Sequence, residues 1–181
     1  MRVISGQFKG RRLKSPAWEG VRPTSDKVRE TLFNIVASRL TDARVLDGYA
    51  GTGAVGIEAL SRGAAHVTFI EHDRRAMSLV QSNLALCGIE RGYTSECGDI
   101  ASVLVRMQSA AEFDLILLDP PYYADPDTVK GVLETAATHL AAGGLLVLER
   151  ATRHEPEVPG NLQRVRDVKS GDSTLTLFTR R

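Results

Sequence analysis

"LDGYAGTGAVG", residues 46–56, is the stretch of the sequence that decides the fold. It connects an apolar run that starts at residue 43 to a helix-like run that Gly63 ends. Gly51, Gly53 and Gly56 match the pattern G-x-G-x-x-G, in which glycines let the backbone pass close to a nucleotide. A strand, a glycine-rich turn and a helix in this order begin a βαβ unit, which predicts a parallel sheet with a nucleoside pocket. A turn that only closes a strand–helix junction is the alternative interpretation.

Strand-like and helix-like runs alternate through the rest of the chain. The expected strands cover residues 43–49, 66–73, 93–99, 113–118, 145–150, 162–170 and 173–180. The expected helices cover residues 26–40, with Ser25 as the N-cap, and residues 54–63, 74–88, 100–107 and 126–144. Strands separated by helices form right-handed crossovers, which predicts an α/β fold with a Rossmann-like, doubly wound, mostly parallel sheet. The last two strands are expected to form an antiparallel pair around Gly171.

The length and composition indicate one main domain. With 181 residues, 43% of them hydrophobic and 25% charged, the chain can bury one sizeable core. We expect a basic β-hairpin extension over residues 1–22 and a Rossmann-like domain over residues 23–181. The N-terminus lacks an apolar signal segment and no apolar run approaches the roughly 18 residues that span a bilayer, so we expect a cytoplasmic protein without membrane contact. The 2 cysteines and 4 histidines show no metal-ligand spacing, so no metal site is expected.

The charges are distributed unevenly along the chain. Residues 1–44 contain 10 Lys and Arg against 4 Asp and Glu, whereas residues 45–150 contain 7 against 14. Five cations and no acid fall within the first 14 residues: Arg2, Lys9, Arg11, Arg12 and Lys14. Such clustering is typical of a surface that neutralises phosphates. A solvated basic tail is the alternative, but two short β-prone runs around glycines favour an ordered hairpin.

Acidic residues follow the first three expected strands of the main domain. Asp47 lies four residues before Gly51, and Glu71 and Asp99 end the next two strands. An acid at the second strand can accept hydrogen bonds from both ribose hydroxyls, and Asp99 can meet an adenine amino group. A carboxylate at Asp47 would repel the pyrophosphate of a dinucleotide but suits a cationic ligand. S-adenosylmethionine, which carries a sulfonium and an amino group, is therefore the expected cofactor.

The fourth expected strand ends in the sequence Asp119-Pro120-Pro121-Tyr122. Two prolines restrict the backbone and carry no N–H, so the segment presents carbonyl oxygens and one carboxylate in a rigid wall. Such a wall can accept both N–H bonds of a nucleobase amino group at Asp119 and the Pro120 carbonyl, and so orient the nitrogen for methylation. We expect Tyr122 to stack on a base that has left its helix or loop. The alternative is a purely structural role, in which the segment is a turn that ends the strand.

These stretches together resemble a known family. "DGYAGTGAVGIEALSRGA" (residues 47–64), "IEHD" (70–73) and "LLDPPY" (117–122) resemble motifs of class I S-adenosylmethionine-dependent methyltransferases that act on nucleobase amino groups. "RVISGQFKGRRL" (2–13) and "RPTSDKVRETLFN" (22–34) extend the similarity to the RsmD-like family over nearly the whole chain. That family methylates the guanine N2 amino group in bacterial 16S ribosomal RNA.

The resemblance implies a partner and further site residues. It implies 16S ribosomal RNA as substrate, within a small-subunit assembly particle, and a monomeric enzyme. It places Thr24 and Arg29 beside the methionine end of the cofactor, and it extends the cofactor contacts to Tyr49, His72 and Ile100. It implies that the basic hairpin, together with Arg22, binds RNA.

Three rival functions remain. Methylation of adenine N6 or cytosine N4 in DNA uses similar motifs, but the chain has no insertion large enough for a target-recognition domain. A non-catalytic RNA-binding assembly factor is the rival from another class, against which the intact Asp119 and Asp47 motifs argue. A nicotinamide-dependent oxidoreductase is disfavoured by Asp47 and by the lack of a separate substrate domain. Cytosine C5 methylation needs a cysteine nucleophile, and Cys87 and Cys97 are expected away from the transferred methyl.

Overall fold

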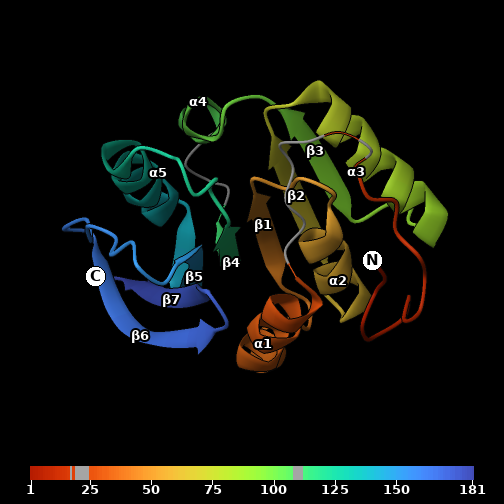
Figure 1. The fold of residues 1–181 in the computed structure, drawn as a ribbon, viewed down its shortest axis with the longest axis horizontal. Helices are drawn as coiled ribbons and strands as arrows, with labels where there is room; N and C mark the ends of the chain where they lie inside the picture. Colours follow the sequence, from red (N-terminus) through yellow and green to blue (C-terminus); the bar gives the residue numbers. More distant parts are fainter. Residues whose placement is uncertain (17, 19–24, 108–111) are drawn as a thin grey trace.

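The computed structural model describes residues 1–16, 18, 25–107 and 112–181 and shows one sheet covered by helices on both faces (Figure 1). The strands are β1 (Arg44–Gly48), β2 (His66–Glu71), β3 (Tyr93–Cys97), β4 (Phe113–Leu118), β5 (Leu140–Ala151), β6 (Leu162–Ser170) and β7 (Ser173–Arg180). The helices are α1 (Asp26–Val36), a 3₁₀ turn η1 (Ala37–Arg39), α2 (Ala54–Ser61), α3 (Arg74–Cys87), α4 (Ile100–Arg106) and α5 (Pro126–Thr138). Within the described ranges, none of the helices is long and apolar enough to cross a membrane.

The strand order is β3-β2-β1-β4-β5-β7-β6, and the first five of these strands are parallel. The chain builds outward from β1 to β3 on one side and then returns to place β4 against β1, with Val45 beside Leu115. This reversal between β1 and β4 opens a crevice at the carboxyl ends of the strands, where doubly wound proteins bind ligands. β7 pairs antiparallel with both β5 and β6. The predicted sheet, including its antiparallel end, is confirmed.

Alternate residues of the central strands face two separate cores. Val45, Leu115 and Val147 pack with α1, α2 and α3, whereas Leu46 and Ile116 pack with α4 and α5. Because successive side chains of a strand point to opposite faces, each central strand supplies both cores, which explains its continuous apolar sequence. The apolar faces of the five helices cover the sheet from the two sides (Figure 1).

Polar side chains cap the helices where the chain leaves the strands. Ser25, Asp73, Asp99 and Asp125 each accept a hydrogen bond from a backbone N–H in the first turn of the helix that follows. The predicted N-cap at Ser25 is confirmed, with Oγ 3.2 Å from the Val28 nitrogen. These caps satisfy backbone N–H groups at the first turn of four of the helices and so help to set where these helices begin.

Two predicted helix ends differ from the structure. The helix expected over residues 126–144 ends at Thr138, and β5 already begins at Leu140. Leu140 pairs with Phe113 of β4, and an irregularity before the next pair accommodates Gly143, which has a φ of 76°. Pairing with β4 overrides the helical pattern of this stretch. The helix expected over residues 26–40 continues beyond Val36 only as the 3₁₀ turn, a frequent helix ending.

The N-terminal segment, residues 1–14, folds back on itself and is docked on α2 and α3. It contains a single antiparallel bridge, between Arg2 and Arg12, in place of two extended strands. The backbone N–H groups of Ile4 and Ser5 donate to the Glu58 carboxylate at 2.7 and 2.9 Å. These contacts hold the segment against α2 through its backbone groups. The domain boundary predicted at residues 22 and 23 lies outside the described residues.

Candidate active site

Three carboxylates from adjacent strands line one pocket at the carboxyl edge of the sheet. Asp47 ends β1, Asp119 follows β4, and Glu149 lies near the end of β5. The walls are apolar and come from α1, α2, β4, β5 and β7: Leu32, Val55, Leu117, Leu118, Val147 and Leu175. Negative groups in an apolar setting favour a ligand that carries positive charge or N–H donors. The structure thus brings Asp47 and Asp119 together as the sequence predicted, and adds Glu149.

Asp47 joins the first strand to the first helix of the βαβ unit. Its side chain is only 4% exposed, and Oδ2 accepts a hydrogen bond from the Gly56 N–H at 2.8 Å. Burial raises the pKa of Asp47 to about 7, the Gly56 hydrogen bond opposes that rise, and the negative charge of Glu71 adds to it. A cationic ligand in the pocket would therefore stabilise the charged form of this carboxylate.

Glu71 organises the glycine loop from the neighbouring strand. Its two oxygens accept hydrogen bonds from the Gly51 N–H at 2.8 Å and from the Asp73 N–H at 2.9 Å. A carboxylate has about four acceptor positions, so these bonds leave capacity for the ribose hydroxyls that the sequence suggested. The exposed His72 pairs with the same carboxylate through Nδ1 at 3.0 Å.

The glycine loop approaches the sheet closely enough to require its glycines. A Cβ placed on Gly56 would lie 2.2 Å from the Phe69 ring, so a side chain there would separate α2 from the sheet. Gly51 and Gly53 have φ values of 56° and 76°, in the left-handed region that glycine enters freely. Tyr49 also has a positive φ, 65°, a conformation that costs a non-glycine residue energy and that is concentrated at functional sites.

Tyr49, Asp99 and Ile100 meet on the side of the crevice formed by β1 and β3. Burial raises the pKa of Tyr49 to about 12, and the negative charge of Asp99 contributes to this rise. Asp99 is exposed and caps α4 through the Ser102 N–H at 2.9 Å. Ile100 is buried against the end of β1, where a Cβ on Gly48 would lie 2.5 Å from its Cδ1. The predicted nucleoside-side residues therefore lie together.

Arg29 is a fully buried cation on α1, the helix that also supplies Leu32 to the pocket wall. Its Nη2 donates to the Arg2 carbonyl at 2.7 Å and to Asp26 at 2.8 Å. Its Nε and Nη1 are buried and have no hydrogen-bond partner within the described residues. Burial lowers the pKa of Arg29. A buried N–H without a hydrogen-bond partner is energetically costly, so Nε and Nη1 suit a ligand with an anionic group that accepts from them. Thr24, predicted beside Arg29, lies outside the described residues.

The Asp119-Pro120-Pro121-Tyr122 segment leaves β4 at the pocket. Asp119 is half-buried and Pro120 is buried, and the Pro121 carbonyl accepts a turn hydrogen bond from the Ala124 N–H at 2.8 Å. The Tyr122 hydroxyl lies 3.0 Å from Ser173 Oγ at the start of β7. The tyrosine predicted to stack on a base is therefore held by its hydroxyl at the edge of the pocket.

Glu149 and Ser173 were not among the site residues predicted from the sequence. Glu149 is 8% exposed, and its Oε1 accepts a hydrogen bond from Ser173 Oγ at 3.0 Å. One signal was present, because Glu149 is an acid near the end of an apolar strand, as are Asp47 and Glu71. Ser173 carried no comparable signal, since its role depends on the antiparallel pairing of β7 with β5.

The five described basic residues predicted to bind RNA are all exposed: Arg2, Lys9, Arg11, Arg12 and Lys14. Arg22 lies outside the described residues. Asn83 of α3 receives the Lys14 N–H at 2.8 Å and donates to the carbonyls of Lys14 and Thr52, which ties the segment to the glycine loop. Through Asn83, the basic segment therefore borders the glycine loop.

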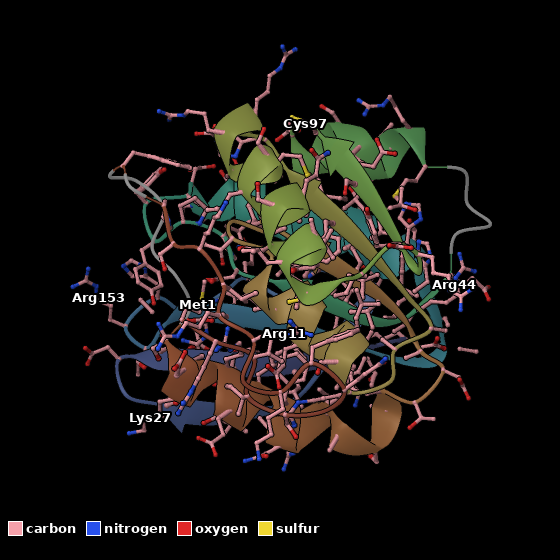
Figure 2. All side chains as sticks on the ribbon, turned by 90° about the vertical axis from the view of Figure 1, so that its right-hand side faces the viewer. Met1, Arg11, Lys27, Arg44, Cys97 and Arg153 are labelled. Carbon is pink, nitrogen blue, oxygen red and sulfur yellow. The ribbon has the colours of Figure 1, made fainter. Side chains whose placement is uncertain are left out.

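Figure 2 shows Met1 and Arg153 toward one side of the molecule and Arg44, at the start of β1, toward the other.

A sheet of this order, with a glycine loop after β1 and acids along the carboxyl edge, is the class I S-adenosylmethionine-dependent methyltransferase fold. The family described as "Conserved hypothetical protein 95" matches residues 1–179, and the chain belongs to this family, the RsmD-like family that its motifs resemble. The Escherichia coli protein "Ribosomal RNA small subunit methyltransferase D" is 36% identical over 187 residues, covering 99% of this chain and 90% of the relative. YlbH from Bacillus subtilis is 36% identical over 183 residues, covering 100% of both chains. The solved structure of Escherichia coli yhhF superposes with a TM-score of 0.86 at 33% identity, covering 100% of this chain and 98% of that one.

Proposed function

We propose that this protein transfers a methyl group from S-adenosylmethionine to the N2 amino group of a guanine in small-subunit (16S) ribosomal RNA. The observation that carries the proposal is the position of Asp119, in a pocket shared with Asp47 at the switch between β1 and β4. The name of the Escherichia coli relative supports small-subunit ribosomal RNA as the substrate. Guanine N2 is proposed because the chain belongs to the RsmD-like family and because the wall formed by Asp119 and Pro120 accepts N–H bonds.

The residues present fit S-adenosylmethionine. The unpartnered Nε and Nη1 of Arg29 suit the cofactor carboxylate, and the buried Asp47 suits its cationic part. Glu71 and Asp99, on the next two strands, suit the ribose hydroxyls and the adenine amino group. The cofactor would supply a methyl group on a positively charged sulfur. Negative side chains around that position favour binding of the charged cofactor over its neutral product.

Asp119 and Pro120 would position the amino group that receives the methyl. A nucleobase amino nitrogen is a poor nucleophile because its lone pair is delocalised into the ring. When its two N–H groups donate to the Asp119 carboxylate and the Pro120 carbonyl, the nitrogen is oriented and its pyramidal geometry is supported. The nitrogen becomes acidic once methylated, and the Asp119 carboxylate that already accepts one N–H can take that proton or pass it to water.

The substrate base would have to leave its helix or loop to reach this pocket. Tyr122, held at the pocket edge by Ser173, can stack on the base, and the exposed cations of residues 1–14 can contact RNA phosphates beside the glycine loop. A basic surface without a target-recognition insertion suits a structured RNA as the substrate. We propose that the protein binds this RNA within a small-subunit assembly particle and acts as a monomer.

The Asp119→Ala variant tests the catalytic part of this proposal. We expect the variant to keep S-adenosylmethionine affinity within about threefold by calorimetry, because other residues hold the cofactor. We expect transfer of labelled methyl to small ribosomal subunits to fall by at least about 100-fold, as when a group that stabilises a transition state is lost. Glu157→Gln, a charge removal on an exposed side chain outside the pocket, is the control. Near-normal turnover by Asp119→Ala would remove this residue from the mechanism.

A further inference from the structure

Glu149 occupies a place in the pocket that the proposed methyl transfer does not yet use. The residues proposed for the cofactor lie on α1, at the ends of β1 and β2 and just after β3. Asp119 follows β4, the other neighbour of β1, and Glu149 lies on β5, the next strand beyond β4. Because Glu149 and Asp119 line the same pocket, a base held by Asp119 would lie close to Glu149.

The orientation of Glu149 is set by a chain of two hydrogen bonds. Ser173 Oγ donates to Glu149 Oε1 at 3.0 Å, and Ser173 Oγ also lies 3.0 Å from the Tyr122 hydroxyl. A serine hydroxyl has one hydrogen. When that hydrogen is used on the carboxylate, the Tyr122 hydroxyl donates to Ser173. The two bonds connect the Glu149 carboxylate to Tyr122 through Ser173 and so restrict the orientation of both side chains.

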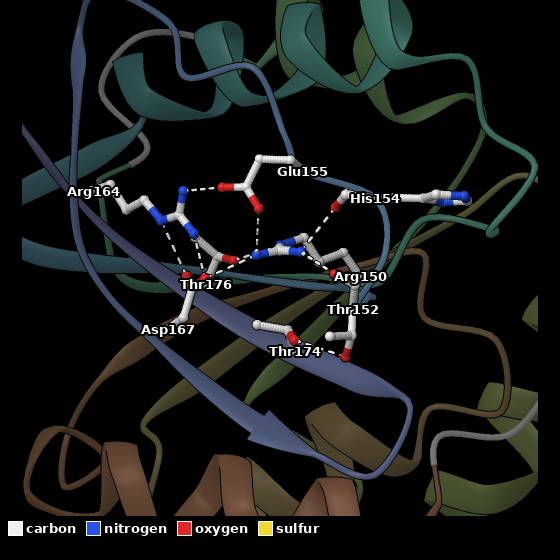
Figure 3. A network of polar contacts seen from close by, with 8 residues as sticks. All are labelled: Arg150, Thr152, His154, Glu155, Arg164, Asp167, Thr174 and Thr176. Atoms are coloured by element: carbon white, nitrogen blue, oxygen red, sulfur yellow. Dashed lines mark hydrogen bonds and ion pairs between the residues drawn. The ribbon is translucent and has the colours of Figure 1, made fainter.

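The next residue, Arg150, fixes the end of β5 from the opposite face of the sheet. Its guanidinium donates to Thr176 Oγ1 at 2.9 Å, the His154 carbonyl at 2.9 Å and Asp167 at 2.8 Å (Figure 3). It also pairs with Glu155 at 3.1 Å, and Arg164 contacts both acids (Figure 3). Consecutive strand residues point to opposite faces, so the Arg150 guanidinium pairs with Asp167 and Glu155 on the face away from the pocket. These contacts fix the backbone at the end of β5, which includes Glu149, without placing the Arg150 charge beside the Glu149 carboxylate.

A second carboxylate beside Asp119 matches the hydrogen-bonding edge of guanine. Guanine presents two neighbouring donors, N1–H and the N2 amino group, whereas adenine presents a bare N1 acceptor beside its amino group. A carboxylate accepts hydrogen bonds and repels lone pairs. A buried carboxylate facing N1 would therefore bind guanine and reject a base whose N1 carries no hydrogen.

We propose that Glu149 accepts the N1–H of the target guanine while Asp119 accepts from its amino group, so that Glu149 determines the base specificity of methyl transfer. Ser173 acts through Glu149 and Tyr122 as a positioning residue. This inference rests on the proposed function and extends it from the reaction to the reading of the base. It explains how the pocket distinguishes guanine from adenine without any residue outside the methyltransferase fold.

The test compares three bases at the modified position. After that position is mapped, small-subunit RNA is prepared with guanine, 2-aminopurine or 2,6-diaminopurine there, and methyl transfer is measured on each. Both analogues keep the C2 amino group, but their N1 is an acceptor. We expect the wild-type protein to prefer guanine by about 100-fold. In Glu149→Gln the side-chain amide can donate to the bare N1, so the preference should fall at least tenfold.

The ratio between bases is measured on one preparation, so loss of folded protein cancels from it. Glu157→Gln should keep the wild-type ratio, and Ser173→Ala should narrow it less than Glu149→Gln does. An unchanged ratio in Glu149→Gln, or a loss of S-adenosylmethionine affinity in its place, would overturn the role of Glu149 and leave the proposed function standing. Failure of the wild-type protein to methylate guanine in any small-subunit RNA or subunit would overturn both.

Discussion

Asp47 is a buried acid that stabilises the fold and that we propose also contacts the cofactor. Its carboxylate accepts a hydrogen bond from the Gly56 N–H and so joins β1 to α2. The residue is almost completely buried from solvent. Burial of a charged carboxylate disfavours the ionised form, so in the unliganded protein the charge is present only in part near neutral pH. A cationic ligand reverses that balance, which links the strength of binding to pH.

The Asp47→Asn variant tests this description through stability. The pKa of Asp47 rises from its ordinary 3.8 to about 7 in the folded protein, so the folded state holds more protons than the unfolded state between these values. The contribution of Asp47 to stability therefore falls as pH rises from about 4 to about 7 and is flat above. We therefore expect the free energy of unfolding of Asp47→Asn, measured with urea and compared with that of the wild type at the same pH, to increase by a few kcal/mol as pH rises from about 4 to about 7.

The same variant should bind S-adenosylmethionine more weakly at pH 8, by at least about tenfold, because its pocket has lost a negative charge. The wild-type affinity should increase with pH up to about pH 7, and the affinity of the variant should not. A stability difference that is independent of pH would contradict the burial of an ionisable Asp47.

The positions of four of these acids were predictable at the level of residues, because each lies at the end of a predicted strand or just after it. Asp47, Glu71, Asp99 and Asp119 each lie at the carboxyl end of a strand, and parallel strands bring those ends to one edge. The hydrogen bonds of Glu71 with Gly51 and of Ser173 with Glu149 join residues far apart in sequence. The periodicity of the sequence does not reveal such pairings, so Glu149, the third carboxylate of the pocket, was found only in the structure.

At the scale of elements, the N-terminal segment is the part in which local pattern was least informative. Glycines and β-prone residues predicted a hairpin, and its two arms are joined by short backbone hydrogen bonds, such as those from the Val3 N–H to the Arg11 carbonyl at 3.0 Å and from the Leu13 N–H to the Met1 carbonyl at 3.1 Å. The N–H groups of Ile4 and Ser5, beyond this short ladder, donate to the Glu58 side chain of α2. In the same way, pairing of Leu140 with Phe113 shortens the helix expected over residues 126–144. Tertiary contacts decided both cases.

The docked segment should bind RNA through its exposed cations. We expect the double variant Arg11→Glu and Arg12→Glu to bind small-subunit RNA more weakly and to lower the slope of log affinity against log salt by about 2, since each contact with a phosphate contributes about one. Fluorescence anisotropy over a salt series measures that slope. Arg44→Glu, at the amino end of β1 and apart from Arg11 in Figure 2, is the control. An unchanged slope in the double variant would remove the segment from the RNA interface.

At the scale of the whole molecule, one sheet brings the sites together. The strand order brings four residues with proposed roles to one edge: Glu71 and Asp99, proposed to contact the nucleoside, at the end of β2 and after β3, Asp119, proposed for methyl transfer, after β4, and Glu149, proposed to bind the base, on β5. The chain needs no second domain to juxtapose cofactor and base, because the reversal between β1 and β4 opens the crevice within the sheet. The fold class and its parallel core followed from the alternation of strands and helices, whereas which acids share a pocket depended on side-chain packing.

The most direct test of the account is the identity of the methylated nucleoside. Labelled methyl from S-adenosylmethionine is offered in parallel to small ribosomal subunits, naked small-subunit RNA and duplex DNA, and the products are digested to nucleosides for mass spectrometry. We expect N2-methylguanosine from the subunits or the RNA, and no label in the DNA. A methylated adenine or cytosine amino group in DNA, or no product at all despite cofactor binding, would contradict it.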